Sequence, residues 1–89
     1  MQTDLEHLRT RINHINEELV RLLNERAAVA LEIGELKAGS GTNVYDPARE
    51  RAVLDQINQL NQGPLDKGAL EEIFATIMTA CREIQLRGQ

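Results

Sequence analysis

Aromatic residues are scarce in this sequence, and that scarcity narrows the folds open to the chain. The 89 residues include one Phe, one Tyr and no Trp, although aliphatic residues are plentiful. A small core built without aromatic side chains suits close-packed helices better than a β-sandwich. At this length we expect a single domain.

Cysteine is almost absent as well. Cys81 is the only one, which excludes a disulfide framework within the chain and a zinc site built on paired cysteines. The sequence offers no cluster of metal ligands, so we expect no metal. A lone thiol fits the reducing cytoplasm, where we expect the protein to act.

Positive charge and long apolar runs are also in short supply. The formal net charge is −4, which does not favour nucleic acid as a partner. No apolar run approaches the roughly 20 residues of a membrane helix, and the N-terminus is polar rather than signal-like. We therefore expect a soluble, unexported protein that binds neither nucleic acid nor membranes.

What the sequence does contain is the periodicity of three amphipathic helices, with no pattern typical of strands. Gly39-Ser40-Gly41 and Gln62-Gly63-Pro64 interrupt the periodicity, and Asp46-Pro47 is a strong helix start, with Asp as N-cap and Pro at the first helical position. We predict one all-α domain over residues 1–89, comprising a helix over about 4–37, a loop over 38–45, a helix over about 46–61, a turn over 62–65 and a helix over about 66–87.

The first predicted helix carries a seven-residue repeat in which nine of ten seam positions are aliphatic and the tenth is Arg26. The two rows of the seam are Leu5, Ile12, Leu19, Arg26 and Ile33, and Leu8, Ile15, Leu22, Val29 and Leu36. A buried Arg without a partner costs several kcal/mol. Either another protein group or a ligand must therefore neutralise Arg26.

The length of this helix predicts a second chain. A helix of about 33 residues is about 50 Å long, whereas a compact globule of this size is about 30 Å across. Two shorter helices cannot cover so long a seam, and a strict heptad repeat is typical of left-handed pairing with another long helix. We predict a two-fold homodimer with antiparallel long helices.

Such a dimer would bring three cations together. Arg26 and Lys37 share a face of the first helix, about 16 Å apart, whereas Arg9 lies about 25 Å from Arg26 in the same chain. In an antiparallel dimer centred near residue 20, the partner's Arg9 lies opposite roughly residue 32, between the other two. The dimer would then contain two equal cationic sites.

The other two helices add polar groups to the same region. Asp46, Arg49 and Glu50 lie in the first turn of the second helix, where backbone N–H groups also favour anions. Cys81 and Gln85 share a face of the third helix, and Gln85 interrupts an otherwise apolar stripe.

Simpler structural interpretations exist for these residues. A polar residue at one seam position often only fixes register and oligomer state, and Lys37 can be an ordinary cation at a helix C-terminus. The other polar candidates can be caps, surface charges or residues of a fraying end, and Cys81 can be a small core residue. The convergence of cations in the predicted dimer favours the functional interpretation.

Four segments resemble the all-helical chorismate mutases, and the match covers nearly the whole chain with its spacing kept. These segments are Leu8-Arg9-Thr10-Arg11-Ile12, Asn24-Glu25-Arg26, Glu32-Ile33-Gly34-Glu35-Leu36-Lys37 and Asp46-Pro47-Ala48-Arg49-Glu50-Arg51. Tyr45-Asp46-Pro47 and the Gly63-Pro64 turn are similar to the subgroup fused to heptulosonate-phosphate (DAHP) synthases. The resemblance implies an intertwined dimer that converts chorismate to prephenate without a cofactor.

The resemblance also implies a role for each candidate residue. The partner's Arg9 and Arg26 would bind the two substrate carboxylates. Lys37 would contact a carboxylate and the breaking ether oxygen, and Gln85 would donate to that oxygen from the other side.

The remaining roles concern the second and third helices. Glu50 would accept a hydrogen bond from the ring hydroxyl, assisted by the backbone at Asp46, and Arg49 would add positive charge near a carboxylate. Cys81 stands where the family often has a small hydroxyl residue, so a supporting hydrogen bond is in doubt there.

Two alternatives stay open at the level of sequence. One is an isochorismate pyruvate lyase of the same fold, and the other is a regulatory or dimerisation module of a fused synthase. If a ligand is the counter-ion of Arg26, the guanidinium of the empty protein should face a polar cavity or borrow a carboxylate such as that of Glu50. If Arg26 only fixes register, it should be packed dry against a structural partner.

Overall fold

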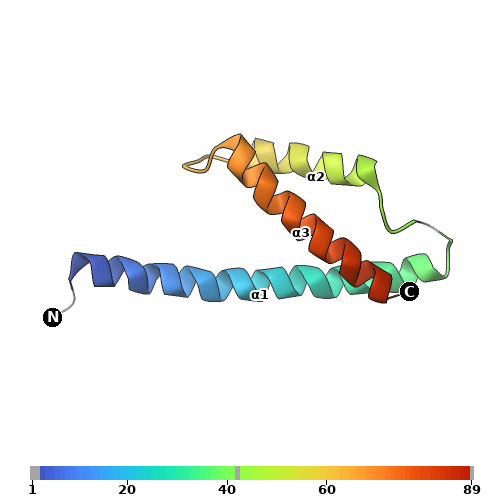
Figure 1. The fold of residues 1–89 in the computed structure, drawn as a ribbon, viewed down its shortest axis with the longest axis horizontal. Coiled ribbons are helices and arrows are strands. Elements are labelled where there is room, and N and C mark those ends of the chain that lie inside the picture. Colours follow the sequence, from blue (N-terminus) through green and yellow to red (C-terminus); the bar gives the residue numbers. More distant parts are fainter. Residues whose placement is uncertain (1–2, 42, 89) are drawn as a thin grey trace.

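The computed structural model describes residues 3–41 and 43–88, and these residues form three α-helices without a strand (Figure 1). The helices are α1 (Asp4–Ala38), α2 (Pro47–Leu60) and α3 (Lys67–Arg87). The all-α fold predicted from the periodicity is therefore confirmed. Each helix begins and ends within one residue of its predicted range.

Side-chain caps fix where the helices begin. Thr3 and Glu6 form a reciprocal capping box, in which Thr3 Oγ1 accepts from the Glu6 N–H at 3.0 Å and Glu6 Oε2 accepts from the Thr3 N–H at 3.2 Å. Asp46 Oδ1 accepts from the Arg49 N–H at 3.0 Å at the start of α2. Asp66 does the same for Ala69 in α3, at 2.8 Å. The N-cap role predicted for Asp46 is therefore confirmed, and Asp66 caps α3 in the same way.

The three helices make an elongated molecule. α3 crosses the C-terminal half of α1, α2 packs on α3, and the N-terminal half of α1 projects beyond both (Figure 1). The extents are 59 × 24 × 15 Å and the radius of gyration is 16.6 Å, against about 12 Å for a compact domain of this length. No helix in the described ranges combines the length and apolarity needed to span a membrane.

The projecting half of α1 exposes the seam. Its apolar side chains there are each at least half exposed, namely Leu5, Leu8, Ile12, Ile15, Leu19 and Leu22. Among residues 3–41 and 43–88, the buried apolar residues are Ala30 on α1, Ile57 on α2, and Met78 and Cys81 on α3, so this core lies where the helices pack on one another. A contiguous exposed apolar stripe of this kind is typical of a protein–protein contact surface.

The crossing of α1 and α3 depends on two glycines. A Cβ at Gly34 would overlap with the backbone carbonyl of Gln85. A Cβ at Gly88 would come within 2.8 Å of the Leu31 carbonyl oxygen. The two helix backbones therefore approach more closely than any side chain would permit.

We predict that Gly34→Ala destabilises the protein. Pushing the helices apart should cost about 1–3 kcal/mol, which outweighs the gain of about 1 kcal/mol from the higher helix propensity of Ala. Urea denaturation at a fixed protein concentration measures the difference.

Gly39→Ala is the matched control, because the nearest atom to its Cβ would be the Leu36 carbonyl oxygen at 3.9 Å. We expect this variant to stay within about 0.5 kcal/mol of the wild type. Equal stability of the two variants would contradict the close-approach argument.

Candidate active site

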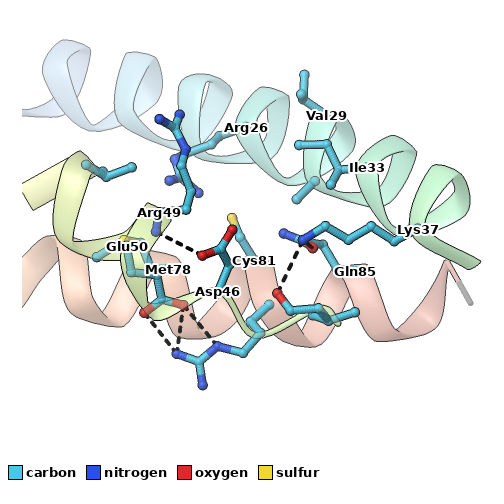
Figure 2. Close-up of a pocket in the computed structure, with 14 residues that line it drawn as sticks. Arg26, Val29, Ile33, Lys37, Asp46, Arg49, Glu50, Met78, Cys81 and Gln85 are labelled. Atoms are coloured by element: carbon cyan, nitrogen blue, oxygen red, sulfur yellow. Dashed lines mark hydrogen bonds and ion pairs between the residues drawn. The ribbon is translucent and has the colours of Figure 1, made fainter. Parts of the chain in front are cut away.

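A cavity of about 450 Å³ lies between the C-terminal half of α1, the start of α2 and the C-terminal half of α3. Seven of the eight site residues predicted from the sequence line it, namely Arg26, Lys37, Asp46, Arg49, Glu50, Cys81 and Gln85. Figure 2 shows Arg26 and Lys37 entering from α1, Cys81 and Gln85 from α3, and the other three from the start of α2. The structure thus brings together residues up to 59 positions apart in the sequence.

The eighth predicted residue, Arg9, lies elsewhere. It is exposed on the projecting half of α1 and does not line the cavity. It lies seventeen positions from Arg26 along the helix, which corresponds to about 25 Å. A single chain therefore leaves Arg9 outside its own cavity, as the helix length predicted.

The cavity carries an excess of positive charge, although the chain as a whole is acidic. Its lining includes four cationic side chains and two carboxylates, so two positive charges are uncompensated. Within the described part of the chain, the guanidinium of half-buried Arg26 forms neither an ion pair nor a hydrogen bond. The expectation that Arg26 faces a cavity is therefore met, and Glu50 is not its stand-in counter-ion.

Lys37 and Gln85 meet inside the cavity from opposite helices. Lys37 Nζ donates to Gln85 Oε1 at 3.3 Å and to the Val44 carbonyl oxygen at 3.4 Å (Figure 2). Because an ammonium group has three donors, one proton of Lys37 stays available to a ligand. Because the amide oxygen of Gln85 accepts from Lys37, its NH₂ group is the part left to donate.

Glu50 pairs with a residue that sequence reasoning missed. Arg82 Nε donates to Glu50 Oε2 and Arg82 Nη2 to Glu50 Oε1, both at 3.2 Å. Arg82 also lines the cavity. Met78 and Gln85 lie four and three residues from Arg82, the helical spacing that places side chains on one face, so the position of Gln85 could have identified Arg82.

Two further predicted residues, Asp46 and Cys81, also stabilise the fold. The Asp46 carboxylate caps α2 and lies near the centre of the cavity (Figure 2). The Cys81 thiol is buried in the cavity wall. Over residues 3–41 and 43–88, no group of three or more His, Cys, Asp or Glu side chains is placed to hold a metal ion.

The sequence profile of the chorismate mutase type II family matches residues 8–86, which include every residue of the cavity. The chain belongs to this family. The resemblance seen in the sequence is thus confirmed at the level of the family.

Three relatives illustrate the range of chorismate mutases that this chain is similar to. It is 38% identical over 86 residues to a bifunctional chorismate mutase/prephenate dehydratase of Aquifex aeolicus, covering 92% of this chain and 24% of the relative. It is 47% identical over 77 residues to the bifunctional enzyme of Neisseria gonorrhoeae, covering 86% and 21%. It is 32% identical over 82 residues to a chorismate mutase of Methanocaldococcus jannaschii, covering 91% and 83%.

The chain spans about a quarter of the length of the bifunctional relatives that it matches. The names of these chorismate mutase relatives pair the mutase with a prephenate dehydratase rather than with a heptulosonate-phosphate synthase. The subgroup likeness inferred from Tyr45-Asp46-Pro47 is therefore not supported by these relatives, whereas the family itself is.

We predict that replacing Arg26 leaves the chorismate mutase fold stable. In Arg26→Met, the long apolar stem still packs while an unpaired charge is removed, so the free energy of unfolding should change by less than about 1 kcal/mol. Chemical denaturation of the ligand-free protein checks this. A loss of about 3–5 kcal/mol, typical of breaking a buried ion pair, would instead assign Arg26 a structural partner and a role in register.

Proposed function

We propose that this chain catalyses the rearrangement of chorismate to prephenate, a step of phenylalanine and tyrosine biosynthesis. The observation that carries the proposal is the excess of two positive charges in a cavity that also holds the unsatisfied donors of Lys37 and Gln85. Chorismate is a dianion that contains an ether oxygen, so its charge and shape complement those of the cavity.

The reaction suits a cavity of fixed donors. In chorismate an ether C–O bond breaks while a C–C bond forms within the same molecule, and no atom is gained or lost. The protein must hold the substrate in a folded conformer and stabilise the negative charge that develops on the ether oxygen. The free proton of Lys37 and the NH₂ group of Gln85 can donate to that oxygen from opposite helices.

The other residues would bind the parts of the substrate that do not react. Arg26 would pair with one carboxylate bidentately, and Arg49 would add positive charge nearby. Glu50 would accept from the ring hydroxyl beside Asp46. The Cys81 thiol is a weak donor, so it would contribute less than the hydroxyl that the family often has at this position.

We further propose that the working form is a two-fold homodimer with antiparallel α1 helices. The exposed seam of α1 supports the dimer, because burying that stripe against a second copy would remove its apolar side chains from water. The partner's Arg9 would then supply the cation for the second carboxylate.

The first test is the activity itself. Purified protein should consume chorismate, followed by its absorbance, and acid treatment of the product should give phenylpyruvate. Lys37→Ala should lower kcat by about 100-fold or more, on the scale of one lost oxyanion donor.

Lys67→Ala is the matched lysine control. Lys67 lies at the start of α3, is mostly exposed and faces Glu71 at 3.9 Å, so its loss should leave kcat within about twofold. Pyruvate as the product from isochorismate, without prephenate, would favour the lyase. No turnover of either substrate would leave a dimerisation or regulatory module.

The sharing of the site between chains has its own test. Arg9→Ala and Lys37→Ala chains, co-expressed with different tags and purified as the heterodimer, should form one intact and one doubly defective site. The heterodimer should therefore recover about half the wild-type activity, although each homodimer is nearly inactive. An inactive heterodimer would show that Arg9 does not act across the interface.

Two finer expectations stay predictions. The reading frame around residues 1–89 would show whether the chain is fused to a heptulosonate-phosphate synthase. Co-purification of the synthase activity would show whether the two proteins associate. The cytoplasmic location expected from the lone cysteine is decided by cell fractionation.

A further inference from the structure

The Arg82 side chain contacts residues of two other parts of the fold, Glu50 in α2 and Tyr45 before it. Its guanidinium holds both oxygens of Glu50 through Nε and Nη2, with Nη2 also 3.1 Å from Glu50 Oε2. About a third of the Arg82 side chain and a quarter of the Glu50 side chain are exposed. The pair therefore lies at the edge of the cavity, where it is partly shielded from water.

The same guanidinium has a second partner on another element. It lies 4.4 Å from the centroid of the Tyr45 ring, a distance at which a cation is attracted to the face of the ring. Tyr45 belongs to the segment between α1 and α2 and directly precedes Asp46. Arg82 thus links α3 to Glu50 in α2 and to the segment that leads into α2.

This arrangement turns Glu50 away from the cations of α1. Figure 2 shows the Glu50 carboxylate pointing away from Arg26, although both residues line the cavity. Without Arg82, the carboxylate would be free to rotate toward the unpaired guanidinium of Arg26. Glu50 would then form an ion pair with Arg26 and compete with the substrate carboxylate that Arg26 binds.

We propose that Arg82 is a positioning residue that holds the Glu50 carboxylate in the orientation that receives a ligand hydroxyl, and that Tyr45 steadies Arg82 in this position. This inference rests on the proposed function, because the hydroxyl is the ring hydroxyl of chorismate. In the described part of the chain, Glu50 Oε1 accepts one hydrogen bond, from Arg82 Nη2, so a second lone pair on that oxygen stays available to the hydroxyl.

A purely electrostatic role for Arg82 would give different results. A cation that only attracts the dianionic substrate would act whether or not Glu50 is present, and Lys would replace it fully. A positioning role depends on Glu50 and on the planar fork of Arg, which Lys cannot reproduce. The two roles can therefore be separated by combining variants.

The experiment is a double-mutant cycle with chorismate as substrate. Arg82→Leu in the otherwise wild-type chain should lower kcat/KM by about tenfold, on the scale of one misplaced charge-assisted hydrogen bond. In the Glu50→Gln background the same replacement should change kcat/KM by less than about twofold. Arg82→Lys should recover only part of the loss.

Three further variants test the role of Tyr45 and control for the loss of an arginine. Tyr45→Phe keeps the ring and should retain full kcat/KM, whereas Tyr45→Leu removes it and should lower kcat/KM by a fewfold, about 2- to 5-fold. Arg51→Leu removes an exposed arginine that is next to Glu50 in the sequence but does not line the cavity, and it should be without effect. Thermal melts monitored by circular dichroism establish that each variant is folded.

Each outcome either supports or overturns the positioning role of Arg82. Full activity of Arg82→Leu, additive losses with Glu50→Gln, or complete recovery by Arg82→Lys would overturn the positioning role while leaving the proposed function intact. A wild-type chain inactive toward chorismate would overturn both.

Discussion

The close approach of α1 and α3 at Gly34 is the constraint on which the rest of the structure depends. Because the Gly34 Cα faces the Gln85 backbone directly, the two helices cross at a distance that no side chain would allow. Lys37 is one turn further along α1, so its ammonium reaches the Gln85 amide. The contact between Lys37 and Gln85 in the cavity thus depends on the missing side chains at this helix crossing, above all that of Gly34.

The second constraint is electrostatic. The chain is acidic overall, yet four cationic side chains and only two carboxylates line the cavity. Of these carboxylates, Glu50 pairs with Arg82 and Asp46 caps α2. An unpaired charge that is partly shielded from water is unfavourable, so the half-buried guanidinium of Arg26 and the excess positive charge of the cavity favour a ligand that carries two negative charges. Donors held in place before the ligand arrives need no reorganisation during the reaction, which is the basis of electrostatic catalysis.

The segment between α1 and α2 contacts cationic side chains of both α1 and α3. Its Val44 carbonyl accepts from Lys37 and its Tyr45 ring lies under Arg82, so it is attached to a cation of α1 and to a cation of α3. Asp46 then starts α2 at the cavity. A short connection thereby places the first turn of α2, with Arg49 and Glu50, against groups contributed by the other two helices.

The sequence by itself determined the three helices, the length of α1 and seven of the residues that line the cavity. Periodicity, capping residues and helix breakers act over a few residues, so Asp46-Pro47 and the heptad seam could be interpreted without coordinates. The same local rules placed Arg26 and Lys37 on one face. Only the tertiary structure decided that Glu50 pairs with Arg82 rather than with Arg26, and that Gly34 contacts Gln85. These contacts join residues 32 and 51 positions apart, and they depend on how the helices cross and which rotamers the side chains adopt, neither of which a repeat within one helix encodes.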